Sequence, residues 1–516
     1  MVKRMDKIGK FGFEVICMMF LVCCFVSMAL INFSKNPDFY CTDMYSDMIY
    51  SIEVWEQKTV FPEGWVFGNQ LYVVATPVLA GLFYGLTNDG CIAMGLATSV
   101  MGLLVVVSFA WMMKPLFKNH GTILCGLTSL VVLTLFAGNP VHSTNGWQLF
   151  FTMCSYYACY LITALLAFGC CLRVDGGWRR SEIGVLILAC ILAFGTGMQS
   201  LRQTVVMVCP IFAMEVLCVI FVKDRKIQWK SFVISGVIVI SNMAGLVAVR
   251  NLDIAQYEIF HSPSIKSITE MLESVLPALQ KMTVLINPFG GLLGIAIGVA
   301  CVVATTIGIY TAWKTNNEKL LKCFLLLILS LMVILAIDIL TKMSIREIYY
   351  FLLFPLVAVV IAALYENGSR FIRMVTIFGV LALMLLGTLN MYPEIKNTAH
   401  NDKYDAVVEY LEEQGINTVY SGWNHGEKIA IASEGEISAG FWRIVDAQAV
   451  RVDYLCNPEV FDKNPSECAF IFRGESNADW GVKHADESGT SLELLAYFPE
   501  HDLYIYKADK IWMKIP

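Results

Sequence analysis

The chain has 516 residues, of which 57% are hydrophobic and only 16% are charged, and its mean hydropathy is +0.62. A soluble domain usually has about a quarter charged residues, so this composition excludes an ordinary soluble enzyme. The net charge of −6 is small for this length, and no basic stripe suggests binding to nucleic acid, so we expect no nucleic-acid partner.

The apolar residues come in blocks of about 20 residues, the length that crosses about 30 Å of hydrocarbon. The first block follows four basic residues and is too long for the apolar region of a signal peptide. No Ala-x-Ala cleavage site closes it, so we predict a retained signal anchor. In all, we predict about eleven transmembrane helices, at 11–33, 90–113, 121–138, 148–172, 183–200, 203–222, 231–250, 287–312, 320–340, 346–365 and 371–391.

The charges of the loops predict an orientation. One set of loops carries 18 basic residues: Lys3, Arg4, Lys7, Lys10, Lys114, Lys118, Arg173, Arg179, Arg180, Lys223, Arg225, Lys226, Lys230, Lys314, Lys319, Lys322, Arg370 and Arg373. The other set carries eight: Lys35, Lys58, Arg202, Arg250, Lys266, Lys281, Lys342 and Arg346. By the positive-inside rule the first set is cytoplasmic, so the N-terminus is cytoplasmic and an odd number of spans puts the C-terminus outside.

The segment 70–88 is apolar but short, and Pro77 and Gly81 interrupt it. If it crossed the membrane, every later loop would change sides and the basic clusters would lie outside. We therefore predict a re-entrant or interfacial helix here.

Three stretches lie outside the predicted spans. The first outer loop, 34–89, is expected to carry surface helices, and 251–286 is expected to hold a helix at 264–281. The composition changes abruptly at 392–516, which we predict to be a small extracytoplasmic α/β domain following a transmembrane domain at 1–391.

Within the C-terminal domain, DKYDAVVEYLEEQG has helical spacing and ends at Gly415, a residue typical of helix C-termini. INTVYSG, EKIAIAS and HDLYIYKA alternate as strands do. Most cysteines lie in apolar blocks, and no Cys-x-x-Cys pair occurs. Cys456 and Cys468 are the one pair that could form a disulfide, although spacing alone does not establish it.

The first outer loop contains the most suggestive chemistry. Asp43 and Asp47 are four residues apart, and Tyr50 follows three residues after Asp47, so on a helix starting near Thr42 they share one face. A carboxylate at a membrane boundary beside aromatic residues suits a general base that activates a hydroxyl or amine acceptor. The alternative is that both acids simply solvate a surface helix and stabilise its N-terminus.

The motif Asp47–Tyr50 (DMIY), followed by Val60–Pro62 (VFP) and then the apolar helix with Pro77, resembles the first outer loop of the GT-C superfamily of glycosyltransferases. That superfamily includes protein O-mannosyltransferases and bacterial aminoarabinose transferases. The resemblance covers the architecture of 1–391. It implies a polytopic α-helical membrane protein with a GT-C-like fold and an early acidic residue of the outer loop as catalytic base.

One departure from the family pattern concerns the acidic motif. Many members have Asp-Glu where this chain has Asp47 and Met48, so Asp43 is an alternative source of the second carboxylate or of the base itself. We favour Asp47. We expect no cofactor and no metal, because one acidic pair provides too few ligands for a divalent ion unless Asp43 and Asp47 bind it with further partners.

Two arginines are candidate ligands of a donor phosphate, because a guanidinium forms bidentate bonds with phosphate and keeps its charge. Arg346 precedes Tyr349 in SIREIYYFLLFPLVAVVIAAL, which resembles a family pattern in which an outer-edge arginine contacts the phosphate of a lipid-linked donor. Arg202 lies in a very short outer turn, GMQSLRQT. For both, the alternative is contact with lipid headgroups.

Further candidates are weaker. His261 is a candidate substrate-binding residue with Tyr50 and Tyr349, although a lone histidine is more often structural. His142 and Asn145 are still weaker candidates for a role in the site. The tail, which contains GINTVYSGWNHGEKIAIASEGEISAGFW, resembles the outer domain of some Gram-positive glycosyltransferases of this superfamily. Trp423, Asn424 and His425 suggest a catalytic role, but we expect the tail to be a scaffold or to recognise the acceptor.

The predicted function is that of an inverting glycosyltransferase at the outer face of a bacterial plasma membrane. Its donor is expected to be a polyprenyl-phosphate-linked sugar, and its acceptor a glycan, lipid or protein. The alternatives are a polysaccharide polymerase or ligase, a flippase or transporter of lipid-linked glycans, and a receptor or scaffold. Asp338, near the outer end of its span, is the only clear acid late in a span, and no two halves of the chain repeat, which disfavours a transporter.

Overall fold

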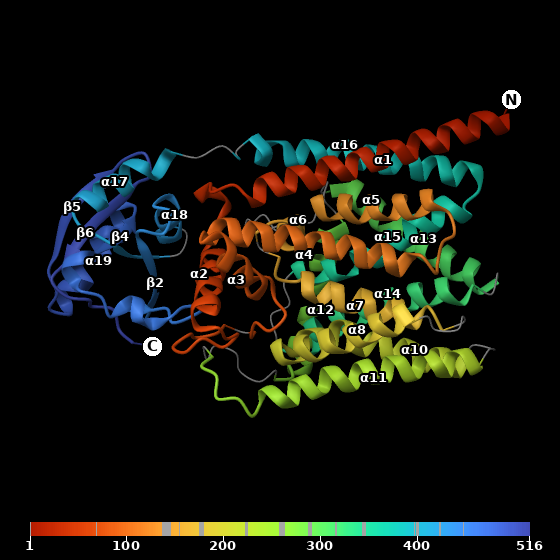
Figure 1. The fold of residues 1–516 in the computed structure, drawn as a ribbon, viewed down its shortest axis with the longest axis horizontal. Helices are drawn as coiled ribbons and strands as arrows, with labels where there is room; N and C mark the ends of the chain where they lie inside the picture. The colour runs from red at the N-terminus through yellow and green to blue at the C-terminus, as the bar shows by residue number, and fades with distance from the viewer. Residues whose placement is uncertain are drawn as a thin grey trace.

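The structure is a computed structural model that describes the chain except for residues 1, 69, 137–145, 154, 175–179, 222–224, 257–263, 287–290, 315–316, 343–346, 397, 399–401, 423–424, 447 and 516. Long helices lie side by side in a bundle, and a smaller domain with a sheet covers one end of it (Figure 1). The chain is thus a polytopic helical protein with a C-terminal α/β domain, as predicted.

Each predicted span corresponds to a helix or a pair of helical segments. They are α1 (Val2–Asn32), α4 (Gly90–Met113), α5 (His120–Phe136), α6 (Gly146–Phe151) with α7 (Ala158–Cys171), α8 (Arg180–Gln199), α9 (Leu201–Gln203) with the π-helical turn η2 (Thr204–Val208) and α10 (Cys209–Phe221), α11 (Arg225–Val249), α13 (Gly291–Lys314), α14 (Glu318–Leu340), the 3₁₀ helix η3 (Glu347–Leu353) with α15 (Phe354–Asn367), and α16 (Arg370–Lys396). Within the described residues, seven helices are long and apolar enough to cross a membrane, and four apolar helices are shorter.

Successive passes through the bundle alternate in direction. α1 begins at the end of the bundle farthest from the C-terminal domain, and the last pass, α16, leads into that domain (Figure 1). The loops with most of the basic residues therefore share the end where α1 begins. Arg173, at that end, packs its guanidinium 3.6 Å from the ring centre of Trp111 and donates to the carbonyl of Gly169.

Glycines allow a close contact between α8 and α11. A Cβ at Gly245 would lie 2.0 Å from the carbonyl oxygen of Phe194, and one at Gly197 would lie 2.1 Å from that of Asn242. Small residues at such positions let helix backbones approach in a membrane, where packing rather than the hydrophobic effect holds helices together.

A buried ion pair joins α10, α11 and α14 and was missed by the sequence analysis. Lys322 donates to the two carboxylate oxygens of Glu215 at 3.0 and 2.8 Å and to the hydroxyl of Ser231 at 3.0 Å. The prediction that Asp338 is the only clear acid late in a span is therefore wrong, and Lys322 lies inside a helix rather than in a loop. A single charged residue within an apolar block does not reveal its partner, because the two residues of the pair are far apart in sequence.

The first outer loop folds against the end of the bundle. It contains η1 (Pro37–Phe39), α2 (Thr42–Gln57) and α3 (Thr76–Thr87). With 12 residues, α3 is about 18 Å long, too short to cross the hydrocarbon, which agrees with the prediction for 70–88. The predicted helix of the second long loop is α12 (Ile268–Ile286).

The C-terminal domain has a six-stranded sheet in the order β3-β2-β1-β4-β6-β5. β1 (Thr418–Ser421) pairs in parallel with β2 (Ser438–Val445) and β4 (Cys468–Arg473), whereas β3 (Gln448–Arg451), β5 (Leu492–Phe498) and β6 (Leu503–Ala508) pair antiparallel. The helices are α17 (Asp405–Glu413), α18 (Gly426–Ala432) and α19 (Glu475–Glu487). The 3₁₀ turns η4 (Asp402–Tyr404), η5 (Pro458–Phe461) and η6 (Pro465–Glu467) complete the domain.

Most predictions for this domain are confirmed, including the helix that ends before Gly415, which has a φ of 67°. The prediction that EKIAIAS is a strand is wrong, because these residues form α18, which buries Ile429, Ala430 and Ile431 together. Alternating Ile and Ala over seven residues fits a short helix as well as a strand. The thiols of Cys456 and Cys468 are both free, so the disulfide that spacing allowed does not form.

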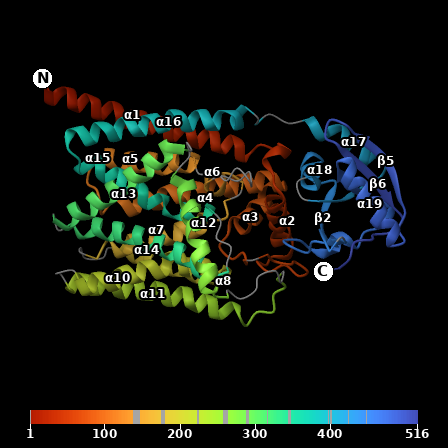
Figure 2. The same ribbon diagram turned by 180° about the vertical axis from the view of Figure 1, so that it is seen from behind.

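Polar contacts hold the C-terminal domain on the outer loop. Asp38 accepts from Lys403 at 3.0 Å and from Lys428 at 3.3 Å, and the backbone N–H of Ala439 donates to the hydroxyl of Tyr45 at 3.1 Å. α2 runs across the end of the bundle, between it and β2, in both views (Figures 1 and 2). One face of α2 therefore lies toward the helical bundle, and the other lies toward the C-terminal domain.

Candidate active site at the end of the bundle

The helix that carries the predicted acids starts where the sequence analysis placed it. α2 begins at Thr42 and ends before Lys58, which adopts a left-handed conformation with a φ of 55°. Asp43 and Asp47 lie one turn apart on it. Asp43 is half-buried, whereas Asp47 is only 1% exposed.

The environment of Asp47 is unusual for an aspartate. Burial raises the pKa of its carboxyl group well above the ordinary value, because a low-dielectric surrounding disfavours the charged form. The nearby hydroxyls of Tyr72 and Tyr156 lower the pKa and the negative charge of Asp43 raises it, but burial is the largest effect. Within the described part of the chain, no hydrogen-bond partner lies at Oδ1. Such a group is poised to take up a proton.

Tyr50, proposed from the sequence as a substrate-binding residue, occupies a closed aromatic core. Its side chain is fully buried against Trp65, Phe67 and Tyr72, and its hydroxyl donates to the carbonyl of Val60 at 2.8 Å. These contacts fix the loop that follows α2. We therefore assign Tyr50 to packing and do not carry it into the proposed site.

Arg202 is held at the same end of the bundle among tyrosines. Its backbone N–H donates to the hydroxyl of Ser200, which caps α9, and its Nη1 donates to the hydroxyl of Tyr157 at 3.1 Å. The guanidinium lies 4.7 Å from the ring centre of Tyr349, a predicted substrate-binding residue, and 5.5 Å from that of Tyr157. Among the described residues, no carboxylate forms an ion pair with it. A positive charge surrounded by hydroxyls and rings is suited to an anion such as phosphate.

Adjacent residues connect the two charged groups. Tyr156 lies beside Asp47, and Tyr157 bonds to Arg202, so both charges flank one dipeptide before α7. A second link comes from the C-terminal domain, where Tyr454 lies near both Tyr72 and Arg202. The acid and the arginine thus belong to one tyrosine-lined site.

Side-chain amides hold the site's backbone in place. Oε1 of Gln199, at the end of α8, accepts from the backbone N–H groups of Val73 and Val74 at 3.1 and 2.6 Å. Tyr160 donates to Oε1 of Gln70 at 3.0 Å. The segment from Gln70 to Val74 is therefore bonded to α7 and α8, which positions Tyr72 beside Asp47.

Several other predicted residues lie outside the described residues. These are Arg346, His261, His142, Asn145, Trp423 and Asn424. His425 is described, and it precedes α18. Burial, with the positive charge of Arg473 next, lowers its pKa to about 4, which fits a neutral imidazole in the domain's interior.

The tyrosines that complete the site were not predicted from the sequence. Tyr72 lies in the predicted interfacial segment 70–88, and Tyr156 and Tyr157 lie within the predicted span 148–172, near a membrane interface where aromatic residues are common. The run SYYACY at 155–160 is the one local signal, since three tyrosines in six residues are dense for a span. Nothing in the local sequence points to Tyr454.

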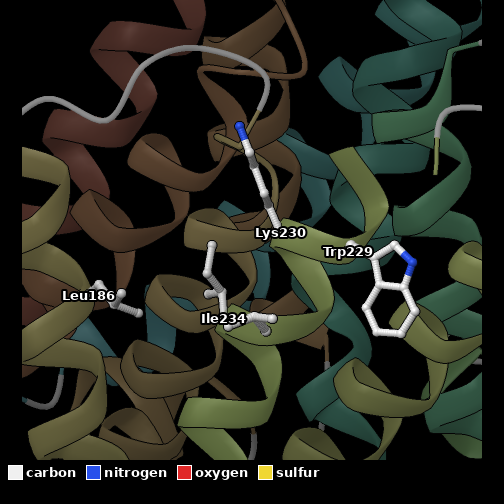
Figure 3. Close-up of a pocket in the computed structure, with 5 residues that line it drawn as sticks. Leu186, Trp229, Lys230 and Ile234 are labelled. Atoms are coloured by element: carbon white, nitrogen blue, oxygen red, sulfur yellow. The ribbon is translucent and has the colours of Figure 1, made fainter. Parts of the chain in front are cut away.

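A hollow of about 450 Å³ lies near the opposite end of the bundle, between the N-terminal halves of α8 and α11. Figure 3 shows Leu186, Trp229, Lys230 and Ile234 around it. Its lining is apolar apart from Lys230, as expected for a lipid-facing groove with an interfacial tryptophan and lysine. It is remote from Asp47.

The solved structures that share the architecture of this chain include two of one protein, ArnT. ArnT from Cupriavidus metallidurans bound to undecaprenyl phosphate has a TM-score of 0.51 and 11% identity, over 96% of this chain and 99% of that one. The apo state of the same protein gives a TM-score of 0.54 and 10% identity, over 97% and 98%. No family model and no curated protein matches the sequence. The chain therefore has a GT-C-like fold, shared with ArnT along nearly its whole length.

Proposed function

We propose that this chain is a membrane glycosyltransferase that transfers a sugar from a polyprenyl-phosphate-linked donor to an acceptor. Transfer takes place at the outer face of a bacterial plasma membrane, with the N-terminus in the cytoplasm. One observation carries the proposal. Asp47, which is buried and can accept a proton, and Arg202, which has no ion-pair partner among the described residues, lie in one tyrosine-lined site.

In the proposed reaction, Asp47 takes the proton of the acceptor's hydroxyl or amine. The acceptor atom then attacks the anomeric carbon, and the bond from that carbon to the phosphate oxygen breaks. An elevated pKa makes Asp47 a stronger base than an ordinary aspartate once it is ionised. A single displacement of this kind inverts the anomeric configuration.

Arg202 stabilises the charge that develops on the leaving polyprenyl phosphate. A guanidinium positioned in advance, away from bulk water, acts on that charge without reorganising. Its contacts with Tyr157 and Tyr349 hold it in place. That the structurally similar ArnT binds undecaprenyl phosphate supports a donor of this class. Arg346 is proposed as a second phosphate ligand and His261 as a substrate contact, from the sequence alone.

The orientation rests on the charges of the loops. The end of the bundle where α1 begins collects most basic loop residues, and the positive-inside rule assigns that end to the cytoplasm. Asp47 and Arg202 then face the outside, away from cytoplasmic nucleotide sugars, which supports a lipid-linked donor.

Lipid-linked sugars extracted from cells with and without the protein test this function. Loss of the chain should cause one polyprenyl-phosphate sugar to accumulate, and wild-type protein should clear it, whereas the Asp47→Asn variant should not. An unchanged profile after loss of the chain would contradict the proposal and favour transport or scaffolding.

A further inference from the structure

A second cavity lies on the other face of α2, between that helix and the C-terminal domain. Its volume is about 180 Å³, room for about six water molecules. Tyr45, Ser46, Ile49 and Glu53 line it from α2. Tyr45, Ile49 and Glu53 are four residues apart and form one stripe of the helix with Ser46 at its border, whereas Asp43 and Asp47 lie on another stripe and do not line the cavity. The cavity is therefore separate from the candidate active site.

Three aromatic side chains from two parts of the chain wall the cavity. Tyr45 and Trp65 come from the first outer loop, and Phe441 comes from β2. The rings of Tyr45 and Phe441 meet edge to face, with centres 6.1 Å apart. Aromatic rings of this kind pack against the C–H groups of a sugar ring, which buries apolar surface without a charge.

The indole of Trp65 supplies a hydrogen-bond donor that lacks a partner. The side chain is only 2% exposed, and among the described residues its Nε1 has no acceptor. Leaving a buried N–H unpaired is unfavourable, so a donor beside a cavity of this size is expected to bond to whatever occupies it.

Polar groups complete the lining. Glu53 projects from α2, and Asn457, Glu459 and Lys463 come from the C-terminal domain. Carboxylates accept hydrogen bonds from hydroxyl groups, whereas the lysine donates to oxygen. The combination of aromatic walls with acceptors and donors suits a small, neutral or amino-bearing ligand rich in hydroxyl groups. It does not suit a polyprenyl chain, which would need a longer and wholly apolar groove.

The cavity exists only because the C-terminal domain docks on the loop. Val66 pairs with Cys456 as an isolated bridge, its N–H donating to the carbonyl of Cys456 at 2.9 Å. Gly64, with a φ of 79°, brings the chain so close that a Cβ there would lie 3.3 Å from Oδ1 of Asn457. The first outer loop therefore forms one wall of the cavity, and the docked C-terminal domain forms the other.

We propose that this cavity is a binding subsite for one pyranose ring, in contact with Tyr45, Trp65 and Phe441 and held through hydroxyl groups by Glu53 and the Trp65 indole. The ring belongs to the acceptor or the product, an assignment that rests on the proposed function; the binding of the ring itself does not. The C-terminal domain then takes part in recognising a glycan rather than serving as a scaffold alone.

Binding of methyl β-glucopyranoside and of glucosamine to the full-length protein in lipid nanodiscs tests the inference, measured by saturation-transfer NMR. The wild-type protein should bind at least one of them. Glu53→Gln and Trp65→Phe should each weaken binding by about tenfold or more. Glu56→Gln, on the exposed side of the same helix and outside the cavity, should leave binding unchanged. Equal melting temperatures of the variants establish that each is folded.

Binding of neither sugar by the wild-type protein, or equal binding by Glu53→Gln and Glu56→Gln, would overturn the inference. The Asp47→Asn variant separates it from the proposed function. If sugar binding depends on Glu53 and persists in Asp47→Asn, the subsite stands, whether or not the protein transfers sugar. If the wild-type protein transfers sugar but Glu53→Gln leaves the acceptor KM unchanged, the subsite is wrong and the function stands.

Discussion

Nη1 of Arg202 donates a hydrogen bond to the hydroxyl of Tyr157 at 3.1 Å. The preceding residue, Tyr156, lies beside the buried carboxyl of Asp47. Consecutive Cα atoms are only about 3.8 Å apart, so this dipeptide connects a proton acceptor from the first outer loop to a cation from the turn between α8 and α10. The chemistry of the proposed function requires such a connection, since proton removal and phosphate departure occur on one substrate pair.

Removal of the Arg202 guanidinium should weaken binding of polyprenyl phosphate by roughly 10- to 100-fold, the effect of losing hydrogen bonds to a charged group. Arg202→Lys should recover only part of the affinity, because an ammonium lacks the planar fork of donors. Native mass spectrometry of Arg202→Ala with undecaprenyl phosphate measures this. Arg250→Ala, an exposed arginine at the end of α11, is the matched control. Equal losses in both variants would mean that Arg202 only contacts headgroups.

The pH dependence of transfer should reveal the raised pKa of Asp47. Only the ionised carboxylate accepts a proton, so kcat/KM should fall as the pH drops through that pKa, well above the ordinary value of 3.8. In Asp43→Asn the neighbouring negative charge is gone, and the acid limb should move to lower pH. An acid limb near 3.8, or one that Asp43→Asn leaves in place, would contradict the role assigned to burial.

The buried pair of Glu215 and Lys322 should behave as a unit. Either Glu215→Gln or Lys322→Met leaves one charge unpaired inside the bundle and should destabilise the protein by about 3–5 kcal/mol. The double variant should recover much of this loss, because no uncompensated charge remains. Thermal unfolding in detergent compares the three proteins. A double variant as unstable as the sum of the two single variants would show that the pair does not act together.

Asp38 should make docking of the C-terminal domain sensitive to acid. Burial raises its pKa, but the hydrogen bond and charge of Lys403, with Lys428, outweigh burial and hold the pKa below 3.8. A depressed folded-state pKa contributes stability above pH 3.8, and that contribution is lost as the pH falls through the folded-state value. At neutral pH, Asp38→Asn should speed hydrogen exchange in α18 by roughly two- to fivefold, since partly exposed ion pairs contribute little. Unchanged hydrogen exchange in α18 would mean that other contacts hold the C-terminal domain in place without Asp38.

The sequence predicts the bundle well, because blocks of about 20 apolar residues match the thickness of the hydrocarbon and are rare in soluble domains. It also predicts that Asp43 and Asp47 share a face, since a helix of 3.6 residues per turn fixes that relation. Burial of Asp47 and the meeting of Arg202 with Tyr349 depend on how helices pack. That packing joins residues more than a hundred positions apart, and no local pattern encodes it.

Two features of the structure that the local sequence does not reveal have a common origin. Tyr50 looked available for a substrate because it shares a face with Asp47, yet the loop that returns over it forms a closed core with Trp65 and Phe67. Glu215 and Lys322 looked unremarkable because each is a single charge in an apolar block. In both cases the partner that decides the role comes from a distant part of the chain.

The most direct test of the central claim is transfer of a labelled polyprenyl-phosphate sugar by the purified Asp47→Asn and Asp43→Asn variants. Loss of general base catalysis should lower kcat in Asp47→Asn by about 10²–10⁴-fold, with the melting temperature not lowered and binding of undecaprenyl phosphate retained. Asp43→Asn should keep substantial turnover. Near-normal turnover by Asp47→Asn, or a loss confined to Asp43→Asn, would contradict the assignment of Asp47 as the base.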